Sequence, residues 1–326
     1  MLLALFRSNQ ASASLLLFIY ALVVQLPFIL FPGSGDFLPT GGYFGLTWSV
    51  GLGGPTLAGL LLAALCLTIT GIAANVSAQR HNMARNITQF PGLFVLLCWA
   101  LVPAAHYFHP VQPALVCLAF AVLALGRVYK RDEPAVPLVN VGLWLGLGSL
   151  FYPKLLWVYP ALVFGIGILR TPDLRSILQP VVGVLIVLFL VGSWAYFRGQ
   201  GSAFLAAQFG GLGWYGLLPA GQYDLLGATV LGLLLLFALV SAGTTVRLLN
   251  IEGSKSVSIL YWLLMSCLPV LAFGGVLSVG ELGLLSLPLG MLLGLRLSAT
   301  SGPTAELVHL LLFAAALALS VLSLLR

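Results

Sequence analysis

Charge is what this sequence has least of. Only 22 of its 326 residues are charged (7%), whereas 60% are hydrophobic and the mean hydropathy is +1.10. A soluble domain carries about a quarter charged residues, and its surface needs roughly that many to stay in water. The shortage excludes a soluble enzyme, a nucleic-acid-binding protein and a disulfide scaffold. We predict a polytopic membrane protein made of one integral membrane domain, residues 1–326.

Several motifs that carry chemistry are also missing. The chain has no Walker A sequence, no GxGxxG opening a soluble unit, and no HExxH or GxSxG element, so coupling to ATP or a nicotinamide would need another subunit. His106 and His109 have a spacing that can place both on one helical face, but a metal site needs a third ligand. No metal is predicted there. The cysteines lie in apolar runs without metal-ligand spacing and are predicted to be small core residues: Cys66, Cys98, Cys117 and Cys267.

Long apolar runs dominate what remains. A helix needs about 20 apolar residues to cross a bilayer. We predict an all-α transmembrane bundle of about eleven spans, with ten and twelve as alternatives because two runs are short and prolines and glycines interrupt residues 268–303. The eleven predicted spans are 13–32, 55–76, 90–108, 112–127, 137–152, 155–169, 179–197, 225–246, 257–274, 281–297 and 304–325.

The cations predict the orientation of these spans. With the N-terminus in the cytoplasm, eleven Lys and Arg residues lie inside and three outside, which obeys the positive-inside rule for a bacterial inner (cytoplasmic) membrane. The net charge of +6 is therefore a topology signal and does not indicate a nucleic acid partner. The inside set is Arg7, Arg80, Arg85, Arg127, Lys130, Arg131, Arg170, Arg175, Arg247, Lys255 and Arg296, and the outside set is Lys154, Arg198 and Arg326.

Two longer segments are predicted to face outward, residues 33–54 and 198–224. Both are rich in glycine and aromatic residues, which favour the membrane interface. If the protein has a working face, these two outer loops build it. The charged groups on that side are the main candidates for function, because charges in or beside a bilayer are costly unless they anchor the chain. Apart from the terminal Arg326 they are Asp36, Lys154, Arg198, Asp224 and Glu281.

Each of these residues has two interpretations. Asp36 follows the first span in a glycine-rich stretch, where it is either a general base or divalent-cation ligand, or a turn residue stabilised by its own backbone. Lys154 and Arg198 are either phosphate ligands or interfacial anchors. Asp224 and Glu281 begin two spans, where the helix dipole favours a carboxylate.

Lys154 lies in the segment Gly142–Pro160, which contains no other charged residue. The run from Gly142 to Lys154, followed by Pro160, Arg170 and Arg175, resembles the middle of an uncharacterised bacterial family of polytopic inner-membrane proteins. The same segment is similar to the lysine-bearing segment of integral-membrane GT-C glycosyltransferases. That second resemblance implies a GT-C-like layout in which Lys154 faces the phosphate of a polyprenyl-linked donor. It also implies that Asp36 matches the position of the catalytic acidic residue in the first outer loop.

The leading hypothesis is a membrane protein that binds or uses a polyprenyl-phosphate-linked sugar at its outer face, as a glycosyltransferase with Asp36 as catalytic residue. Tyr152, Lys154, Arg198, Asp224 and Glu281 would bind the substrate. No cofactor is predicted, apart from a divalent cation as an alternative at Asp36. A second hypothesis is a non-catalytic subunit or scaffold of an envelope assembly, with helices packed through Gly51, Gly53, Gly54 and Gly59 and with envelope protein partners. A transporter is a third hypothesis, disfavoured by the lack of charges at mid-span.

Overall fold

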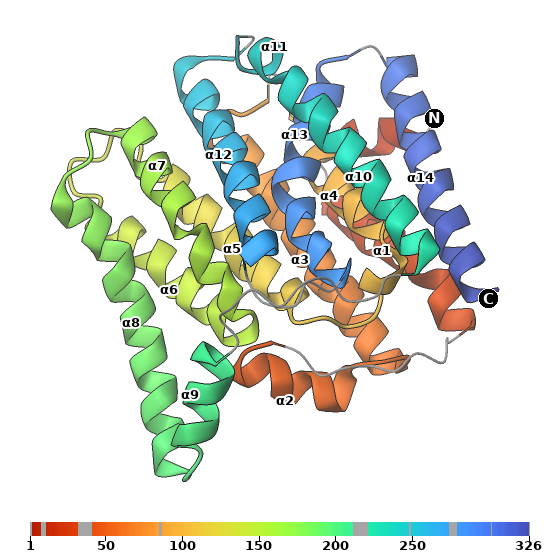
Figure 1. The fold of residues 1–326 in the computed structure, drawn as a ribbon. Coiled ribbons are helices and arrows are strands. Elements are labelled where there is room, and N and C mark those ends of the chain that lie inside the picture. The colour runs from red at the N-terminus through yellow and green to blue at the C-terminus, as the bar shows by residue number, and fades with distance from the viewer. Residues whose placement is uncertain are drawn as a thin grey trace.

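The computed structural model describes residues 2–7, 11–31, 41–84, 87–210, 221–247, 249–273, 279–300 and 302–325, and all regular secondary structure among them is helical. Figure 1 shows the helices gathered into one bundle, with short helices capping it. The α-helices are α1 (Ala11–Leu30), α2 (Tyr43–Leu52), α3 (Leu57–Arg80), α4 (Phe90–Ala100), α5 (Val111–Gly126), α6 (Ala135–Phe151), α7 (Tyr159–Leu169), α8 (Leu174–Phe197), α9 (Gly201–Phe209), α10 (Gln222–Val240), α11 (Ala242–Arg247), α12 (Ile251–Phe273), α13 (Ser286–Ser298) and α14 (Gly302–Leu324). Short 3₁₀ helices are η1 (Leu2–Arg7), η2 (Pro103–Ala105), η3 (Pro153–Val158) and η4 (Val279–Leu285).

Every predicted span contains one of these helices. Among the described residues, six apolar helical segments have the length and composition to cross a membrane, and five shorter ones of 10–17 residues accompany them. The all-α, multi-pass prediction is confirmed, whereas the count of eleven depends on the five short helices. The six long segments are Leu57–Arg80, Leu174–Phe197, Gln222–Val240, Ile251–Leu271, Val279–Ser298 and Gly302–Leu324.

Several predicted boundaries need correction, and prolines account for two of them. The span predicted at 90–108 ends as α4 at Ala100, because Pro103 cannot continue a helix and starts η2 instead. The span predicted from residue 155 begins as the 3₁₀ helix η3 and becomes α7 only at Tyr159, where Pro160 occupies the first turn. The two outer segments, expected as loops, each contain a short helix, α2 and α9, and these two helices contact each other.

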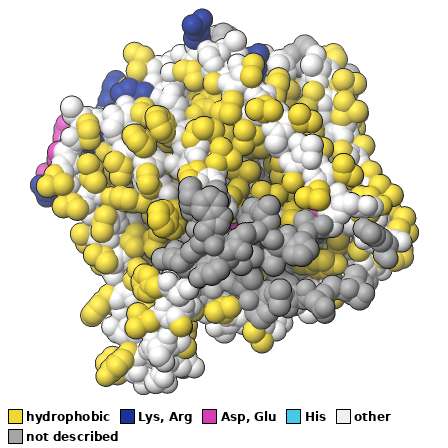
Figure 2. All heavy atoms as spheres, viewed as in Figure 1, with side chains coloured by type: hydrophobic (Ala, Val, Ile, Leu, Met, Phe, Trp, Pro, Cys, Tyr) yellow, Lys and Arg dark blue, Asp and Glu magenta, His cyan; other side chains and the backbone are white. Residues whose placement is uncertain are grey.

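Burial separates a core from a shell. Every residue of α4 is buried, as are eleven of the thirteen residues of α13, which packs against it. The outer helices α8, α10 and α14 instead expose large apolar side chains, among them Phe189 at 72% and Leu233 at 62%. Helices that are apolar all round and still exposed are suited to lipid. Yellow side chains accordingly cover much of the face in Figure 2.

Glycines allow the closest helix contacts. A Cβ at Gly142 of α6 would lie 1.8 Å from the carbonyl oxygen of Pro180 in α8, and one at Gly183 would lie 2.4 Å from the carbonyl oxygen of Val139. Small residues let helix backbones approach in this way. From the sequence we expected other glycines, such as Gly51, to pack helices. For Gly51 this prediction is wrong, because a Cβ built there would meet no atom within 4 Å.

The bundle has two unlike ends. The cation-rich end consists of η1 and the loops near residues 81–84, 87–89, 127–134, 170–173, 241–247, 249–250 and 298–300, and ten of the twelve described Lys and Arg residues lie there. In Figure 2, dark blue side chains gather along the upper edge. The Lys154 end consists of α2, residues 101–110, η3, α9 and η4, and it holds the other two, Lys154 and Arg198. This segregation agrees with the predicted alternation of the spans.

The four cysteines are buried and free, as expected of core residues. His81 and His309 are both buried in structural contacts. The ring of His81 hydrogen-bonds the Leu123 carbonyl at 3.3 Å, and the hydroxyl of Tyr20 lies 3.0 Å from Nε2 of His309.

Candidate functional site at the Lys154 end

The site begins where α6 stops. Pro153 cannot continue the helix, and Tyr152 takes an extended conformation as its C-cap, with its N–H donating to the carbonyl of Gly148. The chain then turns through η3, which carries Lys154. This break in the helix places Lys154 near the surface of the bundle, where its side chain is only 14% exposed.

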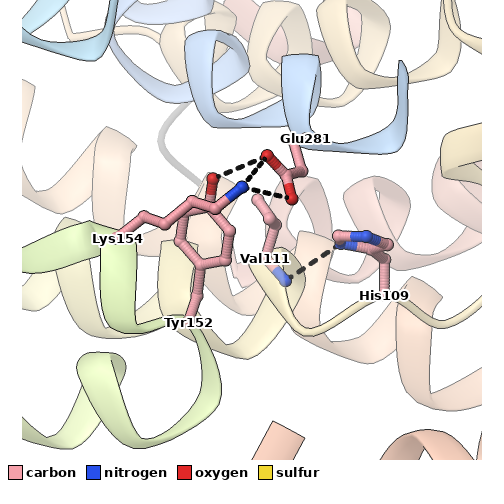
Figure 3. A network of polar contacts seen from close by, with 5 residues as sticks. All are labelled: His109, Val111, Tyr152, Lys154 and Glu281. Atoms are coloured by element: carbon pink, nitrogen blue, oxygen red, sulfur yellow. Dashed lines mark hydrogen bonds and ion pairs between the residues drawn. The ribbon is translucent and has the colours of Figure 1, made fainter. Parts of the chain in front are cut away.

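Glu281 of η4 binds the Lys154 ammonium. Nζ lies 2.8 Å from Oε2 and 3.0 Å from Oε1, and the hydroxyl of Tyr152 donates to Oε2 at 3.1 Å. Figure 3 shows the three side chains converging from α6, η3 and η4. Glu281 is 4% exposed, so this ion pair is buried. Buried pairs owe their stability to good geometry and further hydrogen bonds, and both are present here.

His109 adds a neutral group beside the pair. It lies in the loop before α5, where its Nδ1 accepts from the backbone N–H of Val111 at 3.3 Å, and it faces Gly280 of η4 (Figure 3). Burial, and after it the positive charge of Lys154, lowers the pKa of His109 to about 4. At neutral pH this ring is therefore an uncharged neighbour of the ion pair.

A small cavity of about 120 Å³ opens beside these residues. Its wall includes Gln208 of α9, which is 2% exposed and donates through Nε2 to the carbonyl of Ser149 at 2.9 Å. The other amide atom, Oε1, is buried and has no hydrogen-bond partner among the described residues. The cavity is thus lined by one ammonium, one carboxylate and a glutamine whose buried Oε1 is unsatisfied among the described residues. The lining residues are Gly41, Tyr152, Pro153, Lys154, Ala207, Gln208 and Glu281.

Gly41 and Gly42 bring the first outer segment against this cavity. The N–H of Gly42 donates to the carbonyl of Phe151 at 2.8 Å. Gly41 has a φ of +114°, and a Cβ there would lie 2.6 Å from the same carbonyl oxygen. Only glycine takes this conformation without strain, so the close approach depends on it.

The structure brings together three of the predicted site residues, Tyr152, Lys154 and Glu281. Arg198 is elsewhere: it caps α8, is exposed, and stacks its guanidinium over Trp194 at 4.4 Å. Asp224 lies in the first turn of α10, as expected, and accepts from the backbone N–H of Ala104 at 2.8 Å. Neither lines the cavity. Asp36 lies outside the described residues.

The two histidines that we compared with a metal pair do not share a helical face. Both lie in the irregular segment after η2, and His106 stacks on Phe28 with ring centroids 4.5 Å apart. Among the residues that the structure describes, no three His, Cys, Asp or Glu side chains are close enough to hold a metal ion.

Sequence reasoning missed the pairing of Lys154 with Glu281 and the part played by Gln208. A signal for the pairing existed, because an ammonium near a bilayer needs an anion and the predicted outer side contains only three carboxylates. Glu281 is 127 residues from Lys154, and nothing local in the sequence selects it from the three. Gln208 gave no signal, because a glutamine in a polar segment is unremarkable.

Comparisons with known proteins bear on the fold. No family model matches the chain. No curated protein matches it significantly. Among solved structures it is similar to the crystal structure of ArnT from Cupriavidus metallidurans bound to undecaprenyl phosphate, with a TM-score of 0.54 and 13% identity over 93% of this chain. The chain spans 63% of the length of that ArnT chain.

The GT-C-like layout predicted from the sequence is confirmed as a fold by this likeness to ArnT. At 13% identity the likeness concerns the fold alone. Fold and composition together define this chain as a multi-pass helical membrane protein with a GT-C-like bundle.

Proposed function

We propose that this protein binds a polyprenyl-phosphate-linked sugar at the Lys154 end and transfers the sugar to an acceptor hydroxyl. The observation that carries the proposal is Lys154 itself, a partly buried lysine beside a cavity in a GT-C-like bundle. A similar bundle, ArnT, was solved with undecaprenyl phosphate bound. Lysine is a point charge suited to a phosphate, and a lipid phosphate lies at the depth of a helix end.

Lys154 would exchange anions when the donor binds. In the structure Glu281 neutralises the ammonium, so an arriving phosphate competes with the carboxylate for Nζ. Glu281 keeps a second donor in the hydroxyl of Tyr152, which reduces the cost of giving up the ammonium. We therefore propose that Glu281, itself held by Tyr152, keeps Lys154 in position until a phosphate replaces the carboxylate at Nζ.

The reaction would be a substitution at the sugar's anomeric carbon. The acceptor oxygen forms the new bond, the bond from that carbon to the phosphate oxygen breaks, and the polyprenyl phosphate leaves with the electron pair. Lys154 would stabilise the negative charge on the leaving phosphate, and Asp36 would take the proton from the acceptor hydroxyl. Arg198 is left out of this step because its guanidinium stacks on Trp194, away from the cavity.

Gln208 would bind the sugar part of the donor. Its Nε2 is held by Ser149, so Oε1 stays oriented as an acceptor without a partner. A sugar hydroxyl is a donor of the right kind for this oxygen. The described cavity of about 120 Å³ is smaller than a usual ligand pocket, so it would hold one edge of the sugar. A divalent cation at Asp36 stays a prediction, because Asp36 lies outside the described residues.

We place the protein in the bacterial inner membrane with its N-terminus in the cytoplasm. The support is the distribution of cations, ten of the twelve described ones lying at the end that contains η1. The Lys154 end would then face outward, where a polyprenyl-linked sugar and an envelope acceptor meet.

The test compares three variants in cells and in purified protein. Asp36→Asn should stop transfer, so that the lipid-linked sugar accumulates and envelope glycans change, while binding of polyprenyl phosphate persists. Lys154→Ala should lose both transfer and binding, and Arg131→Gln, a cation at the opposite end, should lose neither. Unchanged envelope glycans and lipid binding in both Asp36→Asn and Lys154→Ala would overturn the proposal.

A second candidate function is a non-catalytic subunit that binds the lipid carrier within an envelope assembly. The observation in its favour is that Glu281 already neutralises Lys154, which leaves no net charge for catalysis in the described cavity. Under this alternative, Asp36→Asn has no effect on glycans, and the protein purifies in mild detergent with a stoichiometric envelope partner.

A further inference from the structure

A groove of about 370 Å³ lies between α3 and α5 and runs to the cation-rich end. Apolar side chains from both helices form its walls, and two arginines, Arg80 and Arg127, lie where the helices end. None of its lining residues belongs to the cavity at Lys154. Its lining residues are Ile69, Ile72, Ala73, Val76, Arg80, Phe120, Leu123 and Arg127.

The two arginines belong to one charged group. Each closes its own helix, Arg80 as the last residue of α3 and Arg127 as the C-cap of α5. Both are close to His81, which packs against Gly126: burial lowers the pKa of this ring, and the positive charges of Arg127 and Arg80 lower it further. The end of the groove therefore carries two permanent positive charges, and both lie near the buried imidazole of His81.

These charges have no carboxylate partner within the described part of the chain. Both guanidiniums are exposed, and neither forms an ion pair with a described Asp or Glu. Glu252 also acts on His81, but its Oε2 accepts a hydrogen bond from Asn82. Because both arginines line the same groove, their positive charges attract an external anion to this end of it.

The shape of the groove specifies what kind of anion fits. A free inorganic anion would use the two arginines and leave the apolar walls empty. A phospholipid would place its phosphate between the guanidiniums, which bind phosphate in a bidentate manner, and lay an acyl chain along Ile72, Val76 and Phe120. Basic pockets between transmembrane helices bind anionic lipid head groups in this way.

We propose that the groove between α3 and α5 is a binding site for an anionic phospholipid, with Arg80 and Arg127 as its phosphate ligands. The lipid binds at the cation-rich end and takes no part in sugar transfer. Its selectivity comes from the head group, because a zwitterionic lipid offers the same acyl chains but carries a positive charge toward the two arginines. The bound lipid would join α3 to α5 in the membrane.

Native mass spectrometry of the full chain, purified in a neutral detergent, tests this directly. Phosphatidylglycerol is titrated into wild type, Arg80→Gln, Arg127→Gln and the double variant, and phosphatidylcholine is titrated in parallel. We expect wild type to prefer phosphatidylglycerol, and the preference to fall about fivefold in each single variant and roughly thirtyfold in the double variant. Arg131→Gln, at the same end but outside the groove, should behave as wild type.

A second variant separates the groove from its charge. Ile72→Trp fills the apolar wall and leaves both arginines, and it should reduce phosphatidylglycerol binding as well. Millimolar inorganic phosphate should not displace the lipid. Equal lipid binding in the double variant and wild type would overturn the proposal. Displacement by inorganic phosphate, or normal binding in Ile72→Trp, would overturn the acyl-chain part and reduce the site to a simple anion site.

Discussion

The two ends of this bundle use charge in opposite ways. At the cation-rich end ten described Lys and Arg residues lie in loops and helix ends, many of them exposed, and they are predicted to set the orientation of the chain. At the Lys154 end only two described cations remain, and one of them is paired within the protein to a buried carboxylate. Exposed charges in solvent contribute little to stability, whereas a buried pair depends on each partner. The two ends therefore differ both in the number of their cations and in whether those cations are exposed or paired with a buried carboxylate.

Breaking the buried pair should have the largest effect. Glu281→Ala leaves the Lys154 ammonium without its anion and Tyr152 without its acceptor, so we expect a loss of about 4 kcal/mol in the free energy of unfolding. Denaturation in detergent measures it. The matched control is Lys154→Met with Glu281→Leu, which removes both charges and should cost much less. A double variant as unstable as the single one would contradict the account of this pair.

Acid should weaken the Lys154 end through its histidines. A histidine whose pKa is lowered by folding stays neutral in the folded chain, while the unfolded chain takes up a proton near pH 6.5. Stability is therefore complete above about pH 6.5 and falls as the pH drops toward about 4, by on the order of 3 kcal/mol for His109. The pKa of His106 is also lowered to about 4, by burial, and adds to the loss.

The check is the melting temperature as a function of pH for wild type and His109→Gln. The variant should lose less stability than wild type between pH 6.5 and pH 4, because it no longer carries the group that protonates only on unfolding. Parallel curves for the two proteins would show that His109 is not buried as a neutral ring.

The close backbone contact at Gly41 tests the Lys154 end without changing any charge. Gly41→Ala forces a side chain into a positive φ and against the Phe151 carbonyl, and should cost about 2 kcal/mol. Gly51→Ala, in α2 and facing open space, should instead stabilise by roughly 0.5 kcal/mol, because alanine favours a helix. Thermal unfolding of the two variants gives the sign of each. Equal effects would mean that the first outer segment does not depend on Gly41.

Removing an exposed cation should have the smallest effect. Arg131→Gln, at the cation-rich end, is expected to change the free energy of unfolding by less than about 0.5 kcal/mol. The same denaturation assay used for Glu281→Ala measures it. A loss comparable to that of Glu281→Ala would erase the distinction between the two ends.

The fold was more accessible from the sequence than the site was. The apolar runs and the predicted membrane side of each Lys and Arg were enough to locate a helix in every predicted span. This worked because a bilayer restricts the length of a span and the positions of charged residues. Prolines shifted two boundaries, at α4 and at η3. The sequence alone did not predict which glycines pack helices, because that depends on which helices become neighbours. Gly142 and Gly183, for example, lie at the contact of α6 with α8.

The site needed contacts that only the folded chain shows. Composition identified Lys154 as unusual, because no other charge lies in its segment, and the sequence included Tyr152 and Glu281 among the candidates. It did not predict that Glu281 would neutralise Lys154 or that Gln208, with an unsatisfied buried oxygen, would line the same cavity. Pairing over 127 residues depends on tertiary structure, in which η3 and η4 meet α5 and α12.

Equilibrium binding of undecaprenyl phosphate to the purified protein in nanodiscs tests the central claim most directly, with wild type, Lys154→Gln and Arg131→Gln compared side by side. If Lys154 is the phosphate ligand, its loss removes a charge-assisted hydrogen bond, and the dissociation constant should rise about tenfold or more. Arg131→Gln should bind as wild type does. Equal affinity of Lys154→Gln and wild type would contradict the claim that the Lys154 end binds the lipid phosphate.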